Sequence, residues 1–118
     1  MSRTISRDEL KALLDRGEPV TLVEALPAAY FEDAHLPGAI NLPHDQVDAL
    51  APALLPDRSA AIVTYCSNRN CPNSGIAARR LTALGYANVR AYEAGKQDWI
   101  EAGLPVERGA TARTAAAS

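Results

Sequence analysis

Residues 60–74, with the sequence AAIVTYCSNRNCPNS, decide the fold, because they combine a buried strand, a cysteine and a short polar loop. Ile62 and Val63 suit a strand that is buried on both faces. Apolar residues recur at helical spacing over residues 76–84, so we expect a helix directly after the loop. The strand would then deliver Cys66 into a loop that ends at the start of a helix.

This arrangement favours a reactive thiol at Cys66. We expect Asn73 or Ser74 to cap the helix and Gly85 to end it. The loop amides and the helix N-terminus, which carries roughly half a positive charge, would then point toward the Cys66 sulfur. Such a field lowers a cysteine pKa from about 8.5 to about 3.5–7.5. The sequence therefore predicts Cys66 as a nucleophile that reacts as a thiolate.

Size and composition are those of one domain with its own core. The chain has 118 residues, 47% of them hydrophobic, which is enough to bury a core without disulfides or metal. Its net charge of -2 argues against nucleic acid as a partner. No apolar run approaches the roughly 20 residues that span a bilayer, and the polar start lacks the apolar segment of a secretory signal. We expect a cytoplasmic protein that binds neither membrane nor nucleic acid.

The two cysteines, Cys66 and Cys71, are more typical of reactive or redox thiols than of a structural disulfide in a protein without an export signal. A zinc site is not expected, because the other soft ligands are His35 and His44 and no paired C-x2-C spacing occurs. We expect no metal and no other cofactor.

Strands and helices alternate along the chain. Strands are predicted at residues 20–24, 39–42, 60–66 and 89–92, and helices at residues 7–14, 27–33, 45–54, after the Cys66 loop and at 96–102. This alternation predicts an α/β fold, with a parallel central sheet of about four to five strands and helices on both faces. Sites in such sheets lie beyond the carboxyl ends of the strands, where Cys66 stands.

The chain is expected to divide into one domain, residues 1–106, and a flexible C-terminal tail, residues 107–118. The tail has no apolar periodicity beyond small alanines, so it cannot bury enough surface to offset the entropy of ordering it.

Five short segments occur in register along the chain. They are HLPGAINLP at 35–43, YC at 65–66, AARRL at 77–81, LGYANV at 84–89 and GKQDW at 95–99. Together they resemble a single-domain rhodanese, a sulfurtransferase, over nearly the whole chain. The resemblance implies that Cys66 takes sulfane sulfur from thiosulfate or a persulfide, holds it as Cys-S-SH and passes it to a thiol or cyanide acceptor. A protein thiol is a further candidate acceptor.

The chain departs from the family pattern at three positions. Glu24 stands where Asp is common, and we expect it to anchor an arginine. Ala34 and Ala94 each replace a usual glycine. None of these changes removes a group that the chemistry requires.

The Cys66 loop is longer than the common short rhodanese loop. Relatives with enlarged loops include phosphatases and arsenate reductases, so such an enzyme is one alternative. It is the weaker one, because Pro72 and Asn73 stand where those enzymes need an arginine to grip a tetrahedral dianion. The other alternative is a non-catalytic binding or sulfur-carrier module, since the fold alone does not fix activity. An intact Cys66 argues against that class.

The roles of individual loop residues stay open. Cys71 is either packed under the helix, a resolving thiol for the Cys66 persulfide, or the true nucleophile. Arg69 either attracts an anionic donor and lowers the cysteine pKa or is a solvated loop residue. The residues expected to line the substrate-binding loop are Ser67, Asn68, Arg69, Asn70 and Cys71.

Overall fold

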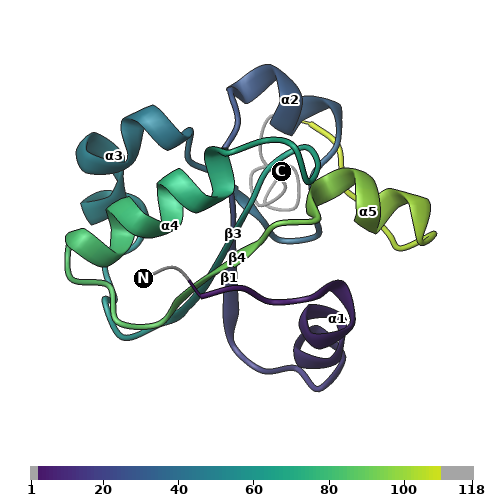
Figure 1. The fold of residues 1–118 in the computed structure, drawn as a ribbon, viewed down its shortest axis with the longest axis horizontal. Coiled ribbons are helices and arrows are strands. Elements are labelled where there is room, and N and C mark those ends of the chain that lie inside the picture. Colours follow the sequence, from purple (N-terminus) through teal and green to yellow (C-terminus); the bar gives the residue numbers. More distant parts are fainter. Residues whose placement is uncertain (1–2, 110–118) are drawn as a thin grey trace.

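A parallel sheet forms the centre of the computed structural model, which describes residues 3–109 (Figure 1). Its strands are β1 (Val20–Glu24), β2 (Ile40–Asn41), β3 (Ala61–Tyr65) and β4 (Val89–Tyr92). They lie in the order β2-β1-β3-β4, and all three pairings are parallel. The α/β fold with a parallel central sheet is therefore confirmed, with β3 in the interior between β1 and β4.

Helices cover both faces of the sheet (Figure 1). Helices α3 (Val47–Leu54) and α4 (Asn73–Ala83) pack on one face, in a cluster that includes Ile62. Three more, α1 (Arg7–Asp15), α2 (Ala28–Asp33) and α5 (Gly95–Glu101), supply the opposite cluster, which includes Val63. Because successive strand residues point to opposite faces, the adjacent apolar pair in β3 serves both clusters.

Most predicted bounds differ from the structure by one or two residues, and the starts of two helices differ in kind. The helix expected over residues 45–54 consists of a short 3-10 helix, η1 (His44–Gln46), followed by α3. Helix α4 is not capped by Asn73 or Ser74, because both lie inside it and Pro72 is its N-cap residue, without a side-chain cap. The Asn73 amide instead donates to the carbonyl oxygen of Ala25 at 3.3 Å. This bond ties the start of α4 to the chain that follows β1.

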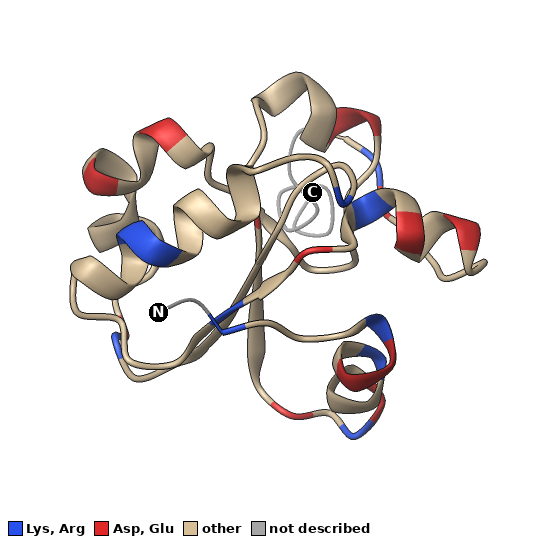
Figure 2. Ribbon diagram, viewed as in Figure 1, with Lys and Arg blue, Asp and Glu red and all other residues tan. Residues whose placement is uncertain are grey.

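Beyond α5 the chain returns to the domain. The backbones of Glu107 and His35 exchange two hydrogen bonds of 2.8 Å. Residues 110–118, most of the predicted flexible tail, lie outside the described residues. No helix within residues 3–109 is long and apolar enough to cross a membrane. Basic and acidic residues are interspersed over the helices (Figure 2).

Candidate active site

Cys66 follows β3 directly and begins the loop that leads into α4 (Figure 1). The start of α5 holds this loop from the side. The backbone N–H of Lys96 donates to the Cys66 carbonyl oxygen and that of Gln97 to the Ser67 carbonyl oxygen, each at 2.8 Å. Two segments separated by the whole of α4 and β4 therefore fix the position of the cysteine backbone.

Gly95 permits this close approach. Its φ is +81°, and a Cβ at this position would lie 2.8 Å from the backbone nitrogen of Asn68 and 2.9 Å from the Cys66 carbonyl oxygen. Both distances are shorter than real Cβ contacts. The residue before the α5 clamp must be glycine for the loop to keep its path.

The Cys66 sulfur is buried beneath the loop. Its thiol donates to the carbonyl oxygen of Cys71 at 3.2 Å, and the carbonyl oxygen of Asn68 lies 3.9 Å from the sulfur. Burial and a hydrogen bond with the Cys71 side chain raise the Cys66 pKa to about 11, against the lowering effect of hydrogen bonding by the Ser74 backbone and hydroxyl. In this conformation Cys66 is a neutral thiol at neutral pH.

The expected thiolate cradle is therefore wrong for this conformation, and the loop's own hydrogen bonds explain why. The Cys71 N–H donates to the Asn68 carbonyl oxygen at 3.1 Å, and the Asn70 N–H donates to the Asn68 side-chain oxygen at 3.0 Å. These two amides are turned away from the sulfur, and carbonyl oxygens face it instead. Of the groups predicted to stabilise a thiolate, the first turn of α4 still acts, because hydrogen bonding by Ser74 lowers the Cys66 pKa.

A hollow of about 350 Å³ opens at the mouth of the loop. Of the predicted loop residues, Arg69, Asn70 and Cys71 line it, whereas Ser67 and Asn68 hold the loop's backbone. Cys71 is half-buried and lines the hollow, whereas Cys66 is buried and does not. The full lining set is Arg69, Asn70, Cys71, Pro72, Ser74, Gly75, Arg79 and Glu93.

Sequence reasoning missed Arg79 and Glu93 in this set. Arg79 lies one turn beyond Gly75 on α4, so helical spacing counted from the end of the loop could have identified it. Glu93 follows the carboxyl end of β4, just as Cys66 follows the carboxyl end of β3. Nothing in the local sequence around Glu93 indicates a site.

A buried ion pair between Lys96 and Glu24 supports the Cys66 loop. Lys96 Nζ lies 3.1 Å from Glu24 Oε2 and donates to the Ala34 carbonyl oxygen at 2.6 Å. The Tyr65 hydroxyl donates to Glu24 Oε1 at 2.9 Å. Burial raises the Glu24 pKa, and the nearby Lys96 opposes that shift. Glu24 thus anchors a lysine and not the predicted arginine, and the same lysine holds the Cys66 carbonyl through its backbone.

Neither histidine within residues 3–109 lines the hollow. His35 is buried, stacked on Phe31 with ring centroids 3.7 Å apart, and its Nδ1 lies 2.8 Å from the Phe31 carbonyl oxygen. Among the residues described, no group of three His, Cys, Asp or Glu side chains is placed to hold a metal ion.

Known proteins are similar to this chain in sequence and in fold. The family model described as "Rhodanese-like domain" matches residues 6–102. The chain is 37% identical over 106 residues to the HTH-type transcriptional regulator Rv0324 of Mycobacterium tuberculosis, covering 90% of this chain and 45% of the regulator. It is 31% identical over 103 residues to the adenylyltransferase and sulfurtransferase MOCS3-2 of Zea mays, covering 83% of this chain and 21% of that protein. The chain thus spans less than half the length of these two relatives.

The fold is also similar to a crystal structure of thiosulfate sulfurtransferase from Pseudomonas aeruginosa. The TM-score is 0.79 at 26% sequence identity, and the match covers 91% of this chain and 20% of that one.

Proposed function

The chain belongs to the rhodanese-like domain family, and we propose that it is a sulfurtransferase in which Cys66 carries the transferred sulfur as a persulfide. Membership supports sulfur transfer at the level of the family. The observation that carries the finer proposal is the position of Cys66, which stands at the carboxyl end of the interior strand and in hydrogen-bonding range of Ser74 in the first turn of α4.

The proposed reaction has two steps. The Cys66 thiolate attacks the sulfane sulfur of thiosulfate or a persulfide, the donor's S–S bond breaks, and sulfite or a thiolate leaves with the electron pair. An acceptor thiol or cyanide then attacks the outer sulfur and releases the Cys66 thiolate. The substrates we propose are therefore a small-molecule donor and a thiol or cyanide acceptor, with a protein thiol as a further candidate acceptor.

The first step requires the loop to rearrange. The thiol must lose its proton and its hydrogen bond to the Cys71 carbonyl oxygen, because a carbonyl oxygen destabilises the thiolate. The Ser74 N–H and hydroxyl remain to stabilise the negative charge on the sulfur. We propose that donor binding shifts the loop toward that open arrangement.

Two roles of Cys71 follow from its place at the hollow. As a resolving thiol it would attack Cys66 Sγ in the persulfide, forming a disulfide and releasing hydrogen sulfide ion. As a packing residue it would separate Cys66 from solvent. The sulfur distribution between the two cysteines distinguishes these roles.

A non-catalytic sulfur-carrier or binding module is the second candidate function. The burial of Cys66 and its raised pKa favour it, because a closed neutral thiol is a slow nucleophile. The similarity to a transcriptional regulator is compatible with such a role. The phosphatase or arsenate-reductase alternative gains no support, since Pro72 stands where the closing arginine is needed.

Mass spectrometry tests the proposal. The protein is incubated with thiosulfate or polysulfide, and peptides are mapped for one added sulfur atom. We expect it on Cys66, with loss in Cys66→Ser and retention in Cys71→Ser. Turnover with thiosulfate and cyanide then separates an enzyme from a carrier. A wild-type protein that takes up no sulfur at Cys66 from either donor would refute both.

A further inference from the structure

Thr64 is a buried polar residue at an otherwise apolar place in the sheet. It lies in β3, two residues before Cys66, and its exposed fraction is 0%. Its partners on the neighbouring strands are Val23 of β1 and Ala91 of β4, and both are fully buried. Burying a hydroxyl costs free energy unless the hydroxyl forms a hydrogen bond. Packing alone therefore favours valine at this position, and the hydroxyl needs an explanation of its own.

The Thr64 hydroxyl reaches the helix that follows the Cys66 loop. It donates to the carbonyl oxygen of Ser74 at 2.8 Å. Ser74 lies in the first turn of α4 and is itself buried. Hydrogen bonding by the Ser74 backbone and hydroxyl lowers the Cys66 pKa. Ser74 thus joins the two residues, because it accepts from Thr64 and acts on the Cys66 sulfur.

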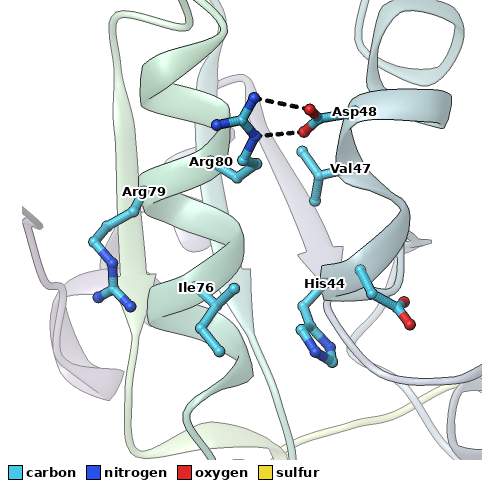
Figure 3. A pocket seen from close by; sticks show the side chains of 7 residues that line it. His44, Val47, Asp48, Ile76, Arg79 and Arg80 are labelled. Carbon is cyan, nitrogen blue, oxygen red and sulfur yellow. Dashed lines mark hydrogen bonds and ion pairs between the residues drawn. The ribbon is translucent and has the colours of Figure 1, made fainter.

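Side-chain hydrogen bonds tie α4 to three other segments within residues 3–109. Arg80 pairs with Asp48 of α3 in the groove shown in Figure 3, where Nη2 donates to Oδ2 at 2.8 Å, and this pair is exposed. The bond from the Asn73 amide to the chain after β1 is partly buried. The bond from Thr64 is fully buried and ends on Ser74 itself. It therefore fixes the turn that acts on the sulfur more directly than the other two.

We propose that Thr64 is a positioning residue, which holds the first turn of α4 against β3 so that the Ser74 N–H and hydroxyl stabilise negative charge on Cys66. The inference rests on the proposed sulfur transfer at Cys66 and adds to it a residue outside the loop. Thr64 does not line the hollow, so it acts through Ser74 and not on the donor.

The loading step shows where this placement matters. The Cys66 thiol gives its proton to solvent, and the thiolate forms a bond to the donor's outer sulfur. The donor's S–S bond then breaks, and the leaving group takes the electron pair. Negative charge stays on the Cys66 sulfur between proton loss and bond formation. Because a hydrogen bond weakens steeply as its angle falls, a first turn that tilts away would stabilise this charge less.

The acidity of Cys66 measures the proposed placement. All variants are made in a Cys71→Ser background, which leaves Cys66 as the single cysteine of the chain. Thr64→Val keeps the branched shape and removes the hydroxyl. We expect the pH profile of alkylation by iodoacetamide to move to higher pH by about one unit, so that alkylation at about pH 8 is about tenfold slower. A ¹³C NMR titration of the Cys66 Cβ should show the same displacement, and it does not depend on access of the reagent.

Three further variants separate the hydroxyl from packing. Thr64→Ser keeps the hydroxyl and should retain the background profile. Thr64→Ala lacks the hydroxyl in a smaller side chain and should show the displacement of Thr64→Val. The matched control is Thr82→Val, since the Thr82 hydroxyl also donates to a carbonyl oxygen of α4, that of Ala78 at 2.9 Å, but near the other end of the helix. Equal profiles in Thr64→Val and Thr82→Val, or a displaced profile in Thr64→Ser, would overturn the inference.

A double-mutant cycle tests whether Thr64 acts through Ser74. In Ser74→Ala the hydroxyl contribution is already lost, so Thr64→Val should displace the profile by less than it does when Ser74 is present. A displacement of the same size would show that Thr64 acts independently of Ser74 and would reject the proposed role.

Sulfur loading connects the measurement to function. Loading of Cys66 by thiosulfate at about pH 8 should be about tenfold slower in Thr64→Val, in proportion to the thiolate fraction. If the wild type takes up no sulfur, the proposed function fails, whereas the alkylation and NMR profiles still decide the role of Thr64.

Discussion

Replacement of Gly95 by alanine tests how the α5 clamp positions the cysteine. The added Cβ would lie within 2.9 Å of three backbone atoms, those of Asn68 N, Asn68 Cα and Cys66 O. Backbone atoms cannot rotate away as a side chain can, so the Cys66 loop must move. Gly103→Ala is the matched control, because Gly103 has a similar φ of +78° and no atom within 4 Å of the added Cβ.

The difference between the two variants isolates the contact with the loop. A side chain in the left-handed region costs roughly 1–2 kcal/mol, and both variants carry this cost. Gly95→Ala adds overpacking, typically about 1–3 kcal/mol. We therefore expect Gly95→Ala to be less stable than Gly103→Ala by about 1–3 kcal/mol, or by ~4–8 °C in Tm for each kcal/mol.

The two variants should differ more in the rate of sulfur loading than in stability. Misplacement of a reacting group by about 1 Å can cost up to ~100-fold in rate, and the loop shift acts on Cys66 directly. Urea unfolding followed by circular dichroism gives the stabilities, and the rate of sulfur loading at Cys66 gives the activity. Equal stabilities together with equal loading rates would refute the claim that the close approach of Gly95 fixes the loop.

Four further predictions concern the cysteines and the buried ion pair. Alkylation of Cys66 by iodoacetamide should keep accelerating as pH rises toward about 11, and a plateau below about pH 8.5 would contradict the buried neutral thiol. Because the folded-state pKa of this thiol is raised, its contribution to stability is complete below the unfolded value and is lost as pH rises toward about 11, measurable as a falling Tm. Sulfur-loaded protein should form a Cys66–Cys71 disulfide if Cys71 is a resolving thiol, whereas peptide mapping that finds none assigns Cys71 to packing. Lys96→Met should destabilise the fold by about 3–5 kcal/mol because it leaves Glu24 buried without its cation, and the double variant with Glu24→Leu should recover part of that loss; a single variant as stable as wild type in urea would show that the pair contributes little.

Local patterns in the sequence were enough to predict the architecture. Strands β1 and β4 have the predicted bounds, since each is a short run rich in β-branched and other apolar residues. Gly85 follows α4 with a φ of +99°, as expected for a helix end. The place of Cys66 after β3 also follows from local pattern, because the strand and the helix that flank the loop each have their own periodicity.

Tertiary structure decided the site's chemistry. The sequence predicts amides around the Cys66 sulfur, yet two of them donate to Asn68 instead and carbonyl oxygens take their place. The partner of Glu24 is Lys96, from a helix that begins far along the chain. In the sequence, Arg79 looks like an ordinary polar helix residue. Only the fold places it at the hollow.

The physical reason is the range over which each interaction acts. Burial patterns and turn residues specify secondary structure within a few positions, so they can be read along the chain. Hydrogen-bond partners, burial of a thiol and the direction of a guanidinium depend on atoms from distant segments. The sequence alone therefore determined where the cysteine stands, and only the packing of α4 and α5 around the loop determined that its thiol is buried and neutral and that two arginines line the hollow at the mouth of the loop.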